Sequence, residues 1–84
     1  MNIEAIVAKI NEILVEEFEV EEDVIEPNKN LRETLDLDSL DYVDLVVIIE
    51  SNFGVRLVEA DFAGIATFAD FYQLIEHKVI VKNA

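Results

Sequence analysis

The chain has 84 residues, enough for one domain (1–84) with an economical core and too few for a large active-site cavity. It contains 19 Asp and Glu residues against six Lys and Arg, and the resulting formal charge of −13 argues against nucleic acid and anionic membrane surfaces as ligands. Cysteine is absent, which excludes disulfides, thiolate metal sites and cysteine nucleophiles.

Apolar residues recur at steps of three and four positions between Ile3 and Leu14, with charged residues between them. This period predicts an amphipathic helix from about residue 3 to about residue 17, with Asn2 as its N-cap. The same segment lacks the basic region and the continuous apolar run of a signal sequence, and no stretch of the chain is long and apolar enough to span a membrane. We therefore expect a cytoplasmic protein.

From Glu19 to Asp38 neither a helical nor a strand period persists, and Pro27 interrupts the segment. A long loop is predicted here, and a connection of this length within a small domain is usually functional or packed by its own side chains. The apolar residues available for that packing are Val20, Val24, Ile25, Leu31 and Leu35.

The segment from Ser39 to Asn52 contains neither Pro nor Gly, and its many β-branched residues leave helix and strand in competition until the period is considered. At about 100° per residue, one side gathers a core-facing stripe of Tyr42, Leu45, Val46, Ile49 and Phe53. The opposite side gathers Leu40, Val43 and Val47 beside acidic residues. A helix with two apolar faces is either fully buried or keeps one face for a partner, and the acidic residues argue against full burial. Gly54 is predicted to end this helix.

The pattern over residues 56–66 is ambiguous, although a short turn of helix is expected over 59–63, ended by Gly64. The expected core contacts of this segment are Leu57, Phe62 and Ile65.

Thr67 and Asp70 resemble a capping box that begins a last helix, which is predicted to reach about Lys78. The expected fold is therefore all-α. It is a small four-helix bundle of three longer helices and one short one, with a long first loop.

Ser39 is the first candidate for chemistry, since it stands at the start of the two-faced helix. Action as a hydrolase nucleophile would need a general base within hydrogen-bond reach and an oxyanion hole. The one histidine, His77, lies near the end of the last predicted helix, and the acidic neighbours of Ser39 would oppose a developing oxyanion. We expect no catalytic residue and no enzymatic activity.

The acidic residues around Ser39 also suggest a calcium loop beginning at Asp36. That template requires glycine where Asp41 stands and a bidentate glutamate where Val47 stands. Both requirements fail, so no specific metal site is expected.

What remains for Ser39 is the acceptance of a phosphate-containing group from another enzyme. Unpaired backbone N–H groups and the positive end of the helix dipole favour a phosphodiester at a helix N-terminus. The simpler alternative is an ordinary capping serine, and the residues by themselves leave both roles open.

The run from Leu35 to Asp41, continued by Val43, Asp44, Leu45 and Val46 and closed by Phe53, resembles the acyl carrier proteins. The resemblance covers nearly the whole chain. It implies that Ser39, within the triplet Asp38-Ser39-Leu40, carries 4′-phosphopantetheine transferred from coenzyme A by a separate phosphopantetheinyl transferase, which makes the chain a phosphoprotein. It also implies that the thiol of this arm holds acyl groups as thioesters, in fatty-acid biosynthesis or in specialised polyketide or lipid biosynthesis.

The resemblance further implies that the helix beginning at Ser39 docks onto basic patches of acyl-processing enzymes. The corresponding surface residues here are Asp38, Leu40, Asp41, Asp44, Val47, Ile48 and Glu50. The inward residues Leu45, Val46, Ile49 and Phe53 would line a core that can admit an acyl chain. Capping is the alternative role for Asp38, and core packing is the alternative for Val47 and Ile48.

Two places depart from the family pattern. Asp36 stands where many members have glycine, although aspartate tolerates a positive φ better than most residues. Ser51 and Asn52 stand where fatty-acid carriers have acids, so a specialised carrier fits as well as a housekeeping one. The alternatives to an acyl carrier are an aminoacyl or peptidyl carrier and an acidic interaction subunit that has the same fold without the arm. A monomer is expected.

Overall fold

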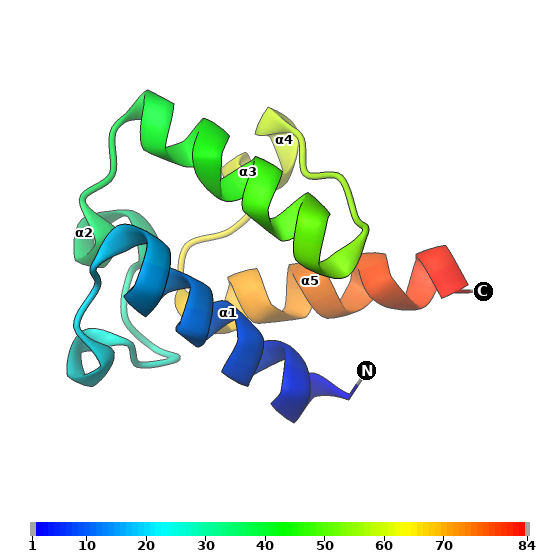
Figure 1. Cartoon of the computed structure of the whole chain (residues 1–84), viewed down its shortest axis with the longest axis horizontal. Coiled ribbons are helices and arrows are strands. Elements are labelled where there is room, and N and C mark those ends of the chain that lie inside the picture. The colour runs from blue at the N-terminus through cyan, green and yellow to red at the C-terminus, as the bar shows by residue number, and fades with distance from the viewer. Residues whose placement is uncertain (1, 84) are drawn as a thin grey trace.

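The computed structural model describes residues 2–83, which form helices and connecting turns without any strand. The long helices are α1 (Ile3–Phe18), α3 (Ser39–Phe53) and α5 (Phe68–Asn83). The short elements are the 3-10 turn η1 (Glu22–Val24), α2 (Leu31–Leu35) and α4 (Glu59–Ala63). Helices α1 and α5 pack side by side and run in opposite directions, and the two chain ends lie on the same side of the molecule (Figure 1). The predicted all-α bundle is confirmed.

The predicted helix count and one helix end need correction. The long first loop contains η1 and the five-residue α2, which begins where the Asn30 side chain accepts the Glu33 N–H at 2.9 Å. Helix α2 is too short for its apolar period to be recognised. Helix α5 runs to Asn83 rather than to Lys78, because no glycine or proline stops it there.

The first loop is held in place by backbone hydrogen bonds to the segment that joins α4 to α5. The Leu31 N–H donates to the Ala66 carbonyl at 2.8 Å, and the Phe68 N–H donates to the Lys29 carbonyl at 3.2 Å. Leu31 is buried against the core, as is Leu35 at the end of α2. Val20 and Ile25 are half-buried and pack against the core, whereas Val24 does not join it. The prediction of a loop packed by its own side chains is therefore confirmed for four of the five residues named for it.

A single apolar core joins all five helices. The buried positions on the long helices include Ile6, Ile10, Ile13 and Leu14 of α1, Leu45, Ile49 and Phe53 of α3, and Phe68, Phe71, Tyr72, Ile75 and Val79 of α5. Leu57 and Phe62, which were predicted as core contacts of the ambiguous segment, are also buried, and Ile65 is half-buried against them. The periodicity of the sequence thus identified most of the core.

Local capping contacts confirm the predicted helix ends. The Asn2 side chain accepts the Ala5 N–H at 2.8 Å at the start of α1. The Thr67 hydroxyl accepts the Asp70 N–H at 3.2 Å, and the Asp70 carboxylate accepts the Thr67 N–H at 3.1 Å. Gly54 ends α3 in the left-handed region, with φ 67°, and Lys82 of α5 packs so closely on it that a Cβ there would collide with the ammonium.

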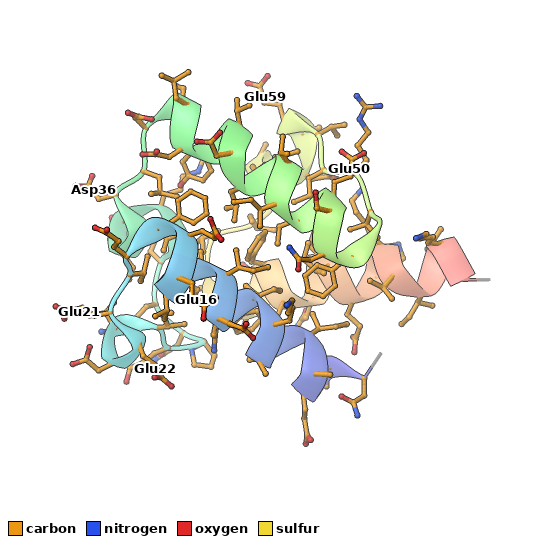
Figure 2. The ribbon with its side chains drawn as sticks, viewed as in Figure 1. Glu16, Glu21, Glu22, Asp36, Glu50 and Glu59 are labelled. Atoms are coloured by element: carbon orange, nitrogen blue, oxygen red, sulfur yellow. The ribbon has the colours of Figure 1, made fainter. Side chains whose placement is uncertain are left out.

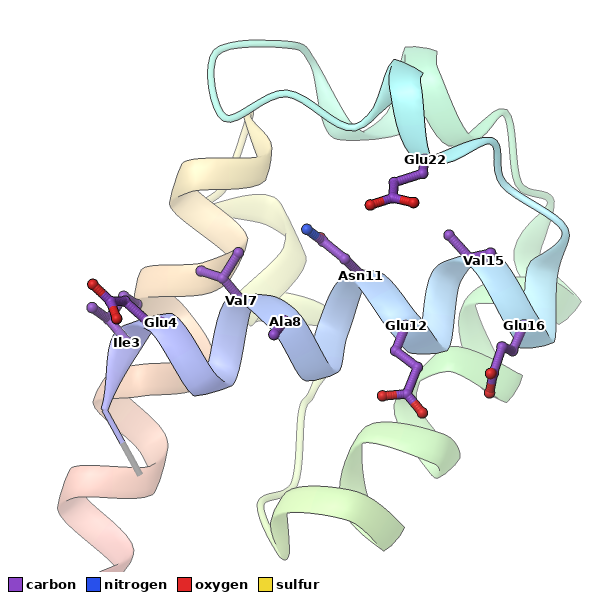
Figure 3. A pocket seen from close by; sticks show the side chains of 9 residues that line it. All are labelled: Ile3, Glu4, Val7, Ala8, Asn11, Glu12, Val15, Glu16 and Glu22. Atoms are coloured by element: carbon purple, nitrogen blue, oxygen red, sulfur yellow. The ribbon is translucent and has the colours of Figure 1, made fainter.

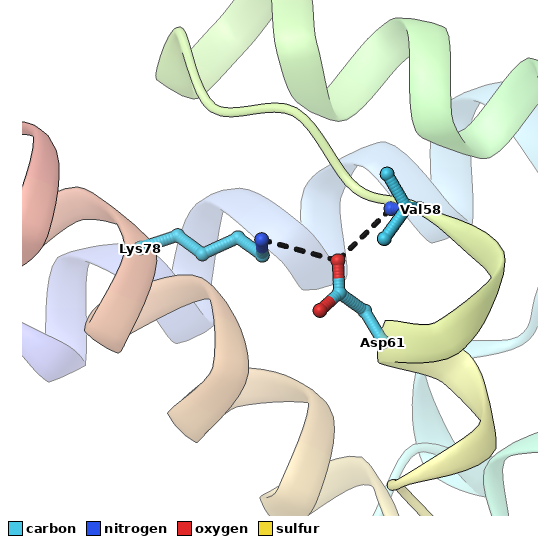
Figure 4. A network of polar contacts seen from close by, with 3 residues as sticks. All are labelled: Val58, Asp61 and Lys78. Carbon is cyan, nitrogen blue, oxygen red and sulfur yellow. Dashed lines mark hydrogen bonds and ion pairs between the residues drawn. The ribbon is translucent and has the colours of Figure 1, made fainter.

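Helix α4 is fastened to α5 by an ion pair, drawn in Figure 4. Lys78 Nζ lies 3.1 Å from Asp61 Oδ2, and the same oxygen accepts the Val58 N–H at 2.9 Å. The Val58 N–H, with help from the Lys78 ammonium, holds the pKa of the Asp61 carboxyl below its ordinary value. This contact positions the segment that carries Phe62 beside α3.

The acidic side chains are distributed over the surface. Glu16, Glu21, Glu22, Asp36, Glu50 and Glu59 extend outward from several different elements (Figure 2). Across residues 2–83, no helix combines the length and the apolarity needed to cross a bilayer.

Candidate functional site

Ser39 is the first helical residue of α3, and its side chain is exposed. The N-cap is Asp38, whose carboxylate accepts the Asp41 N–H at 2.9 Å. Asp41 completes a capping box by accepting the Asp38 N–H at 3.4 Å. The alternative that Ser39 is the capping residue is therefore wrong, and its hydroxyl makes no hydrogen bond to any other residue that the structure describes.

The turn before Ser39 depends on an unusual backbone conformation at Asp36. This residue has φ 48° and ψ 45°, and its N–H donates to the Arg32 carbonyl at 2.9 Å, which ends α2. Aspartate enters the left-handed region more readily than most residues other than glycine, so it can occupy this turn. The chain thus leaves α2, turns, and places Ser39 at the start of α3.

A hollow of about 650 Å³ lies beside Ser39, between α3 and the segments that contain α2 and α4. Its apolar lining comes from Leu37, Val46, Leu57 and Phe62. Its polar lining includes Ser39 itself, Asp38, Tyr42 and Glu59, together with one cation, Arg32. The hollow therefore offers an apolar wall to a chain attached at Ser39.

Tyr42 occupies the position one turn after Ser39, on the side of α3 that faces the core. Its ring meets the ring of Phe62 edge to face, with centroids 5.6 Å apart at an interplanar angle of 71°. Its hydroxyl is buried without a hydrogen-bond partner among the described residues. Burial raises the pKa of Tyr42, and the nearby Arg32 charge opposes that shift. The prediction that this residue packs toward the core is confirmed.

The outer face of α3 presents apolar residues to solvent. Leu40 is 75% exposed, Val43 is 59% exposed and Val47 is 56% exposed. The core alternative for Val47 is therefore wrong, whereas Ile48 is half-buried and packs against the core. Helix α3 thus has one apolar face that packs on the core and a second apolar face that is exposed to solvent.

The acidic residues predicted for the same surface differ in how far they are exposed. Asp38, Asp44 and Glu50 are exposed, and Asp41 is half-buried within the capping box. The structure adds one exposed apolar residue, Val58, which is 52% exposed and which lines the same hollow as Val43. An isolated valine in an irregular segment gives no periodic signal, so the sequence did not reveal it.

The predicted inward residues of α3 lie mostly as expected. Leu45, Ile49 and Phe53 are buried, while Val46 is half-buried and forms part of the wall of the hollow. His77 is exposed on α5, on a different helix from Ser39 and outside the hollow that Ser39 lines. The structure thus brings no histidine into this hollow.

A second hollow, of about 660 Å³, lies along the outer face of α1 and under η1 (Figure 3). Glutamates surround it, namely Glu4, Glu12, Glu16 and Glu22. It contains neither Ser39 nor any basic side chain, and within residues 2–83 no three His, Asp or Glu side chains are grouped as metal ligands would be. Ser39 and the hollow that it lines are therefore the candidate functional site.

A phosphate ester on Ser39 would suit its surroundings. The hydroxyl is exposed, and Asp38 engages the N–H groups of Asp41 and Tyr42 through its side chain and its carbonyl. The N–H groups of Ser39 and Leu40 precede any intrahelical acceptor, so the first turn of α3 can still favour an anion. Arg32 adds one positive charge to the lining of the hollow.

Comparison with known proteins identifies the family. Residues 8–75 match the family model described as the phosphopantetheine attachment site. The acyl carrier protein of Thermotoga maritima is 40% identical over 76 residues, which cover 90% of this chain and 94% of that protein. The meromycolate extension acyl carrier proteins of Mycobacterium leprae and Mycobacterium tuberculosis are 37% identical over 73 residues, which cover 87% of this chain and 64% of theirs. The chain therefore belongs to the acyl carrier protein family and contains its phosphopantetheine attachment domain.

Proposed function

We propose that Ser39 is the residue that bears 4′-phosphopantetheine and that the chain carries acyl groups between enzymes. The observation that supports this most is the position of the Ser39 hydroxyl, which is exposed, free of any capping role and next to a hollow with an apolar wall. When bound, the arm supplies the thiol that a cysteine-free chain lacks and that forms thioesters with acyl groups.

The residues around Ser39 have distinct tasks in this proposal. Asp38 and Asp41 hold the first turn of α3 rigid, so the attachment point is presented in one orientation. Leu37, Leu57 and Phe62 provide the apolar wall against which an attached chain can leave water. Arg32 and the free N–H groups of the first turn favour the phosphate.

We propose that the chain itself catalyses nothing. No side chain that could act as a general base for Ser39 lies in the hollow other than carboxylates, and the one histidine is on α5. Transfer of the arm and every acyl reaction would therefore be carried out by partner enzymes.

The partner surface that we propose is the outer face of α3. Leu40, Val43 and Val47 form an exposed apolar row, and Asp44 and Glu50 lie beside it as exposed acids. This pattern suits the phosphopantetheinyl transferase and acyl-processing enzymes that present an apolar patch bordered by basic groups. The other proposed members, Asp38, Asp41 and Ile48, also serve the cap or the core.

The relatives and the end of α3 bear on the pathway. The relatives named above include carriers for meromycolate extension, and Ser51 and Asn52 thin the acids at the end of α3. We propose a carrier for fatty-acid or specialised lipid or polyketide biosynthesis. The formal charge of −13 favours this over an aminoacyl or peptidyl carrier.

Intact-mass measurement tests the attachment site. The chain is incubated with coenzyme A and a phosphopantetheinyl transferase, and the expected result is a gain of one phosphopantetheine. Ser39→Ala should abolish the gain, whereas Ser51→Ala, which removes the other serine of the same helix, should leave it unchanged. A gain that survives in Ser39→Ala, or no gain in the parent chain with several active transferases, refutes the proposal.

A further inference from the structure

The Tyr42 hydroxyl is a buried polar group that makes no hydrogen bond to any residue that the structure describes. The chain has two tyrosines, and burial raises the pKa of both. The hydroxyl of Tyr72 donates to Asn11 Oδ1 at 2.6 Å. The hydroxyl of Tyr42 has no partner among the described residues, although it is buried.

A buried hydroxyl without a partner destabilises the folded state, because the unfolded chain hydrates it. A phenylalanine at this position would keep the edge-to-face contact with Phe62 and bring no such penalty. The hydroxyl therefore has a favourable role only if an acceptor reaches it in another state of the protein.

The neighbours of Tyr42 narrow down where that acceptor comes from. The side chain of Arg32 offers only donors, and the side chains of Leu37 and Phe62 offer neither donor nor acceptor. The carboxylates that line the same hollow, Asp38 and Glu59, accept no hydrogen bond from the Tyr42 hydroxyl. Leu37, Val46, Leu57 and Phe62 give the hollow an apolar wall, which suits the hydrocarbon part of a cargo better than the amide groups of the arm.

We propose that Tyr42 is a specificity-determining residue for the cargo. Its hydroxyl donates to an oxygen on the acyl chain, so the carrier holds oxygen-bearing acyl groups, such as oxo-acyl chains, more firmly than saturated ones of the same length. The inference rests on attachment at Ser39, since only a cargo tethered there is directed into the hollow that Ser39 and Tyr42 both line.

The test compares matched cargoes on matched variants. The parent chain, Tyr42→Phe and Tyr72→Phe are each loaded with hexanoyl, 3-oxohexanoyl and 5-oxohexanoyl arms from the corresponding coenzyme A thioesters, and loading is verified by intact mass. The midpoint of thermal unfolding, Tm, is then measured for the empty, arm-bearing and acyl-bearing forms. Tyr72→Phe is the control, because it removes the hydroxyl of a buried tyrosine that does not line the hollow beside Ser39.

In the parent chain at least one oxo-acyl form should unfold about 4 °C or more above the hexanoyl form. Tyr42→Phe should abolish that difference, and Tyr72→Phe should retain it. The proposal is overturned if both oxo-acyl forms match hexanoyl, if the difference persists in Tyr42→Phe, or if the arm without cargo already produces the full Tyr42-dependent gain. Absence of loading would instead count against attachment at Ser39, so the two failures are distinguishable.

Discussion

Replacing Tyr42 by phenylalanine should stabilise the empty chain, although most core substitutions destabilise a protein. The ring keeps its place against Phe62, and only the unpartnered hydroxyl is removed. The corresponding change at Tyr72 should have the opposite sign, because it deletes the hydrogen bond to Asn11 Oδ1 at 2.6 Å.

The magnitudes follow from the hydrogen bonding of the two hydroxyls. A buried polar group without a partner costs about 1–3 kcal/mol, and we take the lower end because the Tyr42 side chain as a whole is only half-buried. A hydrogen bond contributes a net of about 0.5–1.5 kcal/mol, which is the expected loss in Tyr72→Phe. For a domain of this size about 1 kcal/mol shifts Tm by about 4–8 °C. Tyr42→Phe should therefore raise Tm by roughly 5 °C, and Tyr72→Phe should lower it by a similar amount.

The assay is thermal unfolding followed by calorimetry, with both changes made in a Ser39→Ala background so that no arm is attached. A second test measures the same Tm values at alkaline pH. The pKa of Tyr42 is raised in the folded state, so above pH 10.0 the unfolded chain loses the Tyr42 proton first and the folded state loses stability. The advantage of Tyr42→Phe should therefore widen as pH rises past that value. A Tm at or below the parent value in Tyr42→Phe, alongside the expected loss in Tyr72→Phe, would refute the reasoning about the buried hydroxyl.

Three further perturbations and one change of solvent test the remaining structural claims. Asp38→Ala should lower Tm by about 4–8 °C through loss of the α3 cap, whereas Asp38→Asn should retain most of the stability; equal losses in calorimetry would contradict the capping role. Asp44→Lys should slow arm transfer by a partner transferase and flatten its salt dependence, and Glu12→Lys, an equal change of charge on α1, should not; unchanged kinetics for Asp44→Lys would exclude the proposed face. Asp61→Asn should lower Tm at pH 6. The pKa of Asp61 is depressed in the folded state, so the stability that its carboxylate contributes is present above the ordinary value of 3.8 and is lost as pH falls below it. A difference in Tm between the parent chain and Asp61→Asn that stayed constant down to pH 2 would argue against the contact with Val58 and Lys78. Added NaCl or MgCl₂ should raise Tm because it screens the net charge of −13, and a Tm indifferent to both would show that self-repulsion is unimportant.

The long helices could be predicted because their information is local. An apolar residue every three or four positions marks a core-facing stripe, and this period located α1, α3 and most of α5. Of the two five-residue helices, α4 was expected over 59–63 with Gly64 at its end, whereas α2 was not predicted. Five residues offer less than two turns over which a period can be recognised. The end of α5 escaped for a related reason, since no local stop signal follows Lys78.

The sequence predicted Ser39 as the candidate site, but it did not predict how the residues around Ser39 are arranged. The spacing of residues around Ser39 indicated a helix start, yet only the backbone geometry assigned the cap to Asp38 and released the serine hydroxyl from that role. The exposed row on α3 was visible as a second apolar face, whereas the exposure of Val58 was not, because no regular element contains it.

The sequence by itself determined the helical class, the acidic surface, the absence of a thiol and the position of the serine, since each of these depends on composition or on neighbours within one helical turn. The tertiary structure alone decided that α2, α3 and α4 meet around a hollow, and that the Tyr42 hydroxyl is buried there without a partner. These features join Arg32, Tyr42 and Phe62, which lie ten to thirty positions apart in the chain. Contacts over such separations are set by how the apolar faces of the helices pack together, and no local period encodes that packing.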